Sequence, residues 1–124
     1  MATLYKLIPQ IETSEMNWSA KVIIVGKQSP KTARNSTTRY ENIVFMDLEG
    51  NQVTAMLYDA NITALNDQLD LGKTYVFSNA TVTDNKSQFR SFADEKIWTI
   101  TGRTKIEELH ENNLNFVFVS TYSI

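Results

Sequence analysis

Aromatic and basic side chains lie close together at two places in this 124-residue chain. Phe89 stands between Lys86 and Arg90. Residues 16–40 contain no acidic residue but include five basic ones: Lys21, Lys27, Lys31, Arg34 and Arg39. Cations bind backbone phosphates and flat rings stack on bases, so this combination is typical of surfaces that bind single-stranded nucleic acid. Because the net charge is −2, such a phosphate-binding surface has to be local.

Side chains suited to catalysis or metal binding are scarce. His110 is the single histidine and cysteine is absent, so a histidine triad, a thiolate metal site and a disulfide all lack their residues. The four glycines are isolated, which excludes a phosphate-cradling glycine motif. No apolar run approaches the roughly 20 residues needed to cross a bilayer. We therefore expect a binding protein that is not an enzyme, with no cofactor, no metal and no membrane partner.

Five segments rich in β-branched and aromatic residues are predicted to be strands. They span residues 16–28, 40–48, 52–59, 73–83 and 88–101. Residues 60–70 are the best helix candidate, because Ile62, Leu65 and Leu69 fall on one face and Gly72 can end the helix. Residues 28–39 combine a proline with small polar and basic residues, which predicts a long functional loop. A sheet of this size cannot bury its apolar face by stacking on itself. An all-β barrel, closed at one end by the helix, is therefore favoured.

Alternation along the second and third strands separates an inner face from an outer one. We assign the smaller aliphatic set to the inside: Val44, Met46, Leu48, Val53, Ala55 and Leu57. The outer face would then carry Phe45, Met56 and Tyr58. Exposed apolar and aromatic side chains on neighbouring strands indicate a binding surface, here a platform for bases, unless another segment covers them. Trp18 and Trp98 are interpreted mainly as core residues.

The secondary structure of the C-terminal residues is less clearly predicted. Thr104–Leu109 could form a short helix, and residues 115–122 alternate like a strand. That strand could pair with the barrel, with another copy of the chain or with a following domain. We expect one domain over residues 1–109 and a C-terminal extension or linker over residues 110–124.

Several short motifs lie in a specific order between Leu7 and Leu109. They are Asn17-Trp18-Ser19, Asp47-Leu48, residues 53–59 (VTAMLYD), residues 71–75 (LGKTY) and residues 85–89 (NKSQF). In order and spacing they resemble the DNA-binding OB domains of the replication protein A large subunit, especially the plant replication-protein-A-like proteins. The resemblance implies a five-stranded OB-fold Greek-key barrel with one helix between strands 3 and 4. It also implies single-stranded DNA binding in the nucleus during replication, repair or recombination, alongside other domains or subunits of such a complex.

The resemblance also assigns roles to individual positions. Tyr58 and Phe89 stand where the family has base-stacking aromatics, and Lys31 lies with Arg34 in a loop whose basic residues contact phosphates and bases. Thr54 departs from the pattern because a related domain has a DNA-contacting arginine there, and Ile97 replaces an acidic residue near the groove. The predicted nucleic-acid site therefore comprises Tyr58, Phe89, Lys31, Arg34, Arg39, Phe45, Met56, Lys86 and Arg90.

Two other functions stay open at this point. RNA could be bound in place of DNA, since nothing in the sequence reports on a 2′-hydroxyl. Alternatively, the chain could be a protein-interaction or oligomerisation OB domain with little nucleic-acid binding, which the net acidity and Thr54 favour. That domain would use the Phe45–Met56 face or the C-terminal strand, including self-association through the latter.

Overall fold

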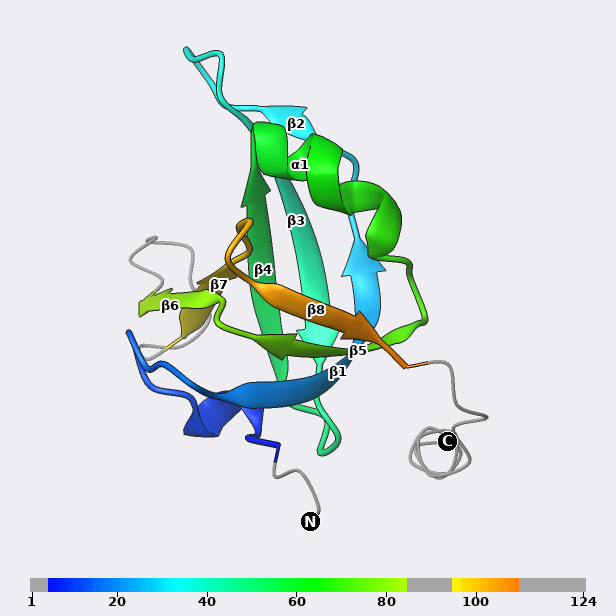
Figure 1. Cartoon of the computed structure of the whole chain (residues 1–124). Coiled ribbons are helices and arrows are strands. Elements are labelled where there is room, and N and C mark those ends of the chain that lie inside the picture. Colours follow the sequence, from blue (N-terminus) through cyan, green and yellow to red (C-terminus); the bar gives the residue numbers. More distant parts are fainter. Residues whose placement is uncertain (1–4, 85–94, 110–124) are drawn as a thin grey trace.

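One curled β-sheet with a short helix at its end makes up the described part of the chain (Figure 1). The computed structural model describes residues 5–84 and 95–109. The eight strands of the sheet are β1 (Ser19–Lys27), β2 (Lys31–Thr32), β3 (Arg39–Met46), β4 (Gln52–Tyr58), β5 (Thr74–Ser78), β6 (Thr81–Asp84), β7 (Lys96–Thr99) and β8 (Lys105–Glu108). The helical segments are η1 (Ile8–Gln10), α1 (Ala60–Leu65) and η2 (Asn66–Gln68). None of the helices in the described ranges is long and apolar enough to span a membrane.

Two strands that are consecutive in the sequence, β5 and β6, lie towards opposite ends of the sheet. The strand order is β6-β7-β4-β3-β1-β5-β8, with β2 paired to β3. β5 lies near one end of this order and β6 at the other, yet only Asn79 and Ala80 separate them in the sequence. Asn79 has a φ of 63°, a left-handed conformation that asparagine adopts more readily than most residues. The predicted strand 73–83 is therefore two strands, and the bend between them curls the sheet into a barrel.

Aromatic side chains fill the centre of the barrel. The ring of Phe45 lies 4.5 Å from that of Phe77 and 5.8 Å from that of Trp98, measured between centroids. Trp18 and Trp98 are both buried, as predicted, with ring centroids 4.9 Å apart. The three inward residues of β4 are also those that alternation predicted: Val53, Ala55 and Leu57.

Burial of Phe45 corrects its predicted place on the outer face. Its side chain is 0% exposed, so it cannot stack on a base. The hairpin register gives the reason: Met46 pairs with Gln52, which places Phe45 opposite Val53 and on the same inward face. Val44 and Met46, predicted inside, are half-buried on the other face. Both faces of this strand are apolar, so alternation alone could not choose between them.

The helix closes one end of the barrel, as predicted, but α1 ends at Leu65 and η2 replaces the rest of the predicted helix 60–70. Ile62 of α1 and Leu69, which follows η2, are both buried. Lys27 holds the far end of this helical segment, because its Nζ donates to the backbone oxygens of Asn66, at 2.8 Å, and Leu69. The side chain of Asn66 in turn donates to the buried carboxylate of Glu41 on β3 at 2.6 Å. Lys27 thus satisfies carbonyl groups at a helix end, and its ammonium is engaged there.

Residues 105–108 form β8, which corrects the short helix predicted for Thr104–Leu109. β8 pairs antiparallel with β5. Ile106 packs against the core while Lys105 and Glu107 are exposed, which is the period of a strand. The edge of β5 offers this segment backbone partners, whereas a helix of one turn is costly to nucleate. The predicted strand 115–122, and the extension 110–124 that contains it, lie outside the described residues.

We expect Phe45→Ala to lower the free energy of unfolding by about 3–5 kcal/mol, because it leaves a cavity beside Phe77 and Trp98. Val44→Ala removes methyl groups from the solvent side of the same strand and should cost about 1 kcal/mol or less. Urea unfolding followed by tryptophan fluorescence measures both values. Equal losses in the two variants would contradict the register of this hairpin.

Candidate nucleic-acid interface

A lysine and two tyrosines form one row across three strands. The register pairs Lys31 of β2 with Tyr40 of β3, and Tyr40 with Tyr58 of β4. Residues directly opposite each other on antiparallel strands point to the same face, with Cβ atoms about 5 Å apart. Tyr58 is 39% exposed, Lys31 is exposed and Tyr40 is half-buried. These three residues, here called the tyrosine row, place a cation beside two rings on the outer face of the barrel.

Tyr40 is a candidate binding residue that the sequence analysis missed. Its partner Tyr58 lies across the β3–β4 hairpin, so their pairing is visible only once the register is known. Once one pair of the hairpin is known, the other pairs follow by counting. Counting six residues outward from the Met46–Gln52 pair on each strand leads to Tyr40 and Tyr58.

Tyr58 owes its position to the sharp change of direction that follows it. Asp59 has a φ of 47°, a left-handed conformation that aspartate tolerates, and it precedes α1 as the N-cap residue. Its carboxylate accepts a hydrogen bond of 2.9 Å from the backbone N–H of Arg39. Its own N–H donates to the backbone oxygen of Arg39 at 3.0 Å. These bonds fix the end of β4 against the start of β3, and so keep Tyr58 beside Tyr40.

The basic residues of the predicted loop 28–39 do not all share one surface. Lys31 belongs to the tyrosine row, and Arg34 is exposed in the turn between β2 and β3. This segment is a short hairpin in which Ala33 N–H donates to Thr38 O at 2.7 Å. Arg39 alternates with Tyr40, so its side chain leaves β3 on the opposite face. Lys31 and Arg34 therefore remain the better candidates for phosphate contacts.

A second row crosses four strands beside the tyrosines. Register pairs connect Asn42 of β3, Met56 of β4, Thr99 of β7 and Thr81 of β6. Met56, predicted on the outer face, is half-buried there. The Oδ1 atom of Asn42 is buried and has no hydrogen-bond partner among the described residues. Such an acceptor raises the free energy of the folded state, because it loses its hydrogen bond to water without gaining another. We call these four residues the Met56 row.

Thr54 and Ile97, the two positions that depart from the family pattern, lie opposite each other. The parallel register of β4 and β7 pairs them directly, and Val44 faces Thr54 from β3. This part of the outer face is consequently neutral. Since one substitution removes a positive charge and the other a negative one, relative to the family pattern, their combined effect on the charge of the face is small.

Three predicted site residues lie outside the described residues: Lys86, Phe89 and Arg90. They belong to the segment that connects β6 to β7. Within the described ranges no group of three or more His, Asp or Glu side chains could hold a metal ion. Elsewhere on the barrel, hydrogen bonds from Lys73 to Asp70 and Glu108, each 3.3 Å long, raise the pKa of Lys73. That ammonium is therefore already paired.

The curled sheet, the helix at its end and the order of its strands define an OB fold. DNA-binding domain A of Saccharomyces cerevisiae replication protein A superposes with a TM-score of 0.68 and 26% identity, covering 85% of this chain and 93% of that one. A replication protein A heterotrimer bound to single-stranded DNA contains a chain that matches with a TM-score of 0.73 and 19% identity, over 87% of this chain and 25% of that one. The expected fold class is confirmed.

The particular resemblance is to replication protein A in sequence as well. The 70 kDa DNA-binding subunits B and D of Arabidopsis thaliana replication protein A are each 27% identical over 112 residues, which is 82% of this chain. No family model matches. The chain spans 18% of the length of these curated relatives. The resemblance predicted from the motifs is thereby confirmed.

We expect Asn42→Leu to leave the free energy of unfolding unchanged, or to raise it by about 1 kcal/mol, because it removes a buried acceptor without a partner. Asn51→Leu is the matched control. It should lower the free energy by about 1–3 kcal/mol, because the Asn51 side chain donates to both carboxylate oxygens of Asp47. Thermal and urea unfolding compare the two. An equal loss in both would contradict the absence of a partner for Asn42 Oδ1 among the described residues.

Proposed function

We propose that this domain binds single-stranded DNA on the outer face of β3 and β4, without catalysing a reaction. The tyrosine row carries the proposal, because it places two rings and a cation in register on one face. Stacking contributes about 1–3 kcal/mol per base and does not depend on sequence, while a neighbouring cation attracts the phosphate. Arg34, in the turn beyond Lys31, would extend the positive surface along the bound DNA.

The proposal also includes Phe89 as a third ring, flanked by Lys86 and Arg90. These residues connect β6 and β7, the strands that carry Thr81 and Thr99 of the Met56 row. In this proposal Phe89 stacks on a base, and Lys86 and Arg90 bind phosphates of the DNA on the side of the face away from β2. Two matched proteins are DNA-binding subunits by name, and a third is a heterotrimer bound to single-stranded DNA. By analogy, we propose work in DNA replication, repair or recombination in the nucleus, within a larger assembly.

Burial of Phe45 weakens the alternative of a protein-interaction domain. One of its two surfaces was an apolar outer patch made by Phe45 and Met56, and Phe45 is inside the core. The other surface, the predicted C-terminal strand, lies outside the described residues. What remains on the outer face is a mixture of tyrosine, lysine, threonine and asparagine around Met56, with Val44, Met46 and Ile97 half-buried near Thr54. Such a surface suits the flat rings and hydrogen-bonding edges of bases better than an apolar partner.

Truncating the rings tests the stacking mechanism. Tyr58→Ala and Tyr40→Ala should each weaken binding of a fluorescein-labelled dT oligomer by about 5- to 150-fold, since each removes about 1–3 kcal/mol of stacking. Tyr58→Phe keeps the ring and should bind nearly as the unchanged protein does. Fluorescence anisotropy at low salt gives the affinities. Unchanged affinity in both alanine variants would refute the stacking mechanism, whereas an unchanged protein that binds no oligomer would refute the proposed function.

Neutralising single charges tests which cations face the DNA. Lys31→Gln should reduce the slope of log affinity against log salt concentration by about 0.7, the value expected for one phosphate on a single strand. Arg39→Gln makes the same change in charge on the opposite face of β3 and should leave the slope unchanged. Titrations at several salt concentrations provide both slopes. A larger effect from Arg39 than from Lys31 would contradict the assigned face.

A further inference from the structure

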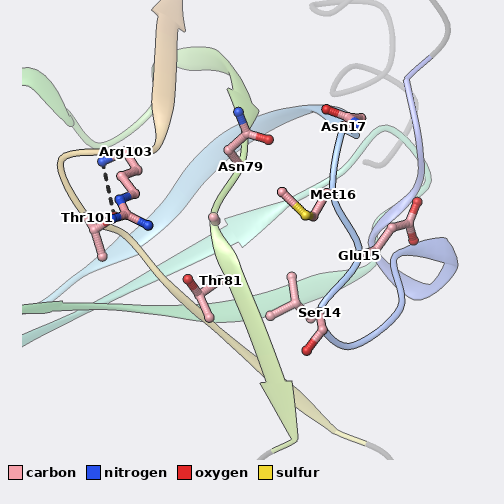
Figure 2. Close-up of a pocket in the computed structure, with 10 residues that line it drawn as sticks. Ser14, Glu15, Met16, Asn17, Asn79, Thr81, Thr101 and Arg103 are labelled. Atoms are coloured by element: carbon pink, nitrogen blue, oxygen red, sulfur yellow. Dashed lines mark hydrogen bonds between the residues drawn. The ribbon is translucent and has the colours of Figure 1, made fainter.

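A hollow of about 340 Å³ lies where the β5–β6 bend, the start of β1 and the β7–β8 turn meet (Figure 2). Arg103 and Thr101 line it from the turn, and Ser14 and Met16 from the segment before β1. Thr81 of β6 stands between these two groups in Figure 2. Met16 is 74% exposed, so the hollow joins an apolar contact surface to a cation.

Arg103 is the uncompensated charge of this hollow. Its side chain is exposed, and among the described residues its guanidinium forms no ion pair. The backbone N–H of Arg103 donates to Thr101 Oγ1 at 3.2 Å, which ties its main chain to the turn. The one acidic residue of the lining, Glu15, is paired with Lys6. Hydrogen bonds from Lys6 and from the backbone N–H of Glu12 lower the pKa of Glu15, so the carboxylate stays ionised and compensated by lysine.

The hollow continues the outer face that carries the tyrosine row. Thr81 is its shared residue, because it lines the hollow and also ends the Met56 row. From Thr81 the register leads through Thr99 and Met56 to Asn42, which follows Tyr40 on the same face of β3. Uncharged side chains alone make up this path. A polyanion lying along it meets no negative charge before the hollow, where the carboxylate of Glu15 is paired with Lys6.

The length of this path decides how many nucleotides it can accommodate. From β2 to β6 the sheet order crosses four strand spacings, through β3, β4 and β7. At about 4.8 Å per spacing, the path is about 19 Å long. A stacked strand rises about 3.4 Å per nucleotide, so about five or six nucleotides would cover the path. This number lies within the range of about 4–16 nucleotides that single OB folds occupy.

We propose that Arg103 and the hollow beside it bind a backbone phosphate of the same single strand that stacks on the tyrosine row. The inference rests on the proposed function, and it assigns the far end of the strand to the β7–β8 turn. Short oligomers would occupy the tyrosine row alone, while longer ones would also reach Arg103. Arg103 would bind a phosphodiester group, and Met16 would provide an apolar contact beside it.

Oligomer length makes the inference testable. Arg103→Gln should weaken binding of dT10 about 3- to 10-fold and reduce its salt slope by about 0.7, since one phosphate contact is lost. It should leave binding of dT4 unchanged. Arg103→Lys keeps the positive charge and should retain most of the dT10 affinity. Lys105→Gln, an equal change of charge on exposed β8 outside the lining of the hollow, should alter neither affinity.

The possible results separate the inference from the proposed function. If the unchanged protein binds dT10 and Arg103→Gln binds it equally well, the assignment of Arg103 is wrong while the proposed function stands. An equal loss with Lys105→Gln would also overturn the assignment, because net charge would then explain the effect. An equal loss of affinity for dT4 and dT10 would mean that Arg103 does not contact the far end of the longer oligomer, which would overturn the assignment. If the unchanged protein binds neither oligomer, the proposed function itself fails.

Discussion

The register of the β3–β4 hairpin determines which side chains fill the barrel and which meet the solvent. Asp47 fixes that register at the turn, where its carboxylate accepts hydrogen bonds from the backbone N–H groups of Glu49 and Asn51. The same carboxylate accepts the N–H of Ile8 at 2.8 Å, which ties the N-terminal segment to the turn. A slip of one residue would exchange the faces of β3, exposing Phe45 and burying Val44. Core and outer surface are thus determined by the same set of hydrogen bonds.

Pairing of charges explains how a slightly acidic chain can present a cationic surface. Lys27 is engaged at the end of the helix, Lys73 is paired with acids, and Arg39 lies on the face opposite the tyrosines. Lys31 and Arg34 remain on one side of the outer face and Arg103 on the other. Between them the Met56 row is uncharged. The net charge of −2 therefore says little about this surface, because the acids that produce it are distributed elsewhere.

Features whose signal is local could be predicted from the order of residues. Along β4 only one phase of the alternation is aliphatic, so its buried side was predicted without ambiguity: Val53, Ala55 and Leu57. The spacing of Ile62 and Leu69 placed the helix, and the size of Trp18 and Trp98 placed both in the core. A run of short strands with one helix then favoured a barrel. In each case neighbouring residues carry the signal, because side-chain periodicity belongs to a single element.

Features that depend on pairing between distant segments required the folded structure. Phe45 and Val44 are both apolar, so only the partner strand could assign their faces, and Tyr40 became a candidate through its position opposite Tyr58. Residues 105–108 became a strand because the edge of β5 supplied hydrogen bonds. Arg103 of the β7–β8 turn lines a hollow together with residues of the β5–β6 bend. These outcomes follow from backbone hydrogen bonds between segments far apart in the chain, and the periodicity of a single segment contains no information about its partner.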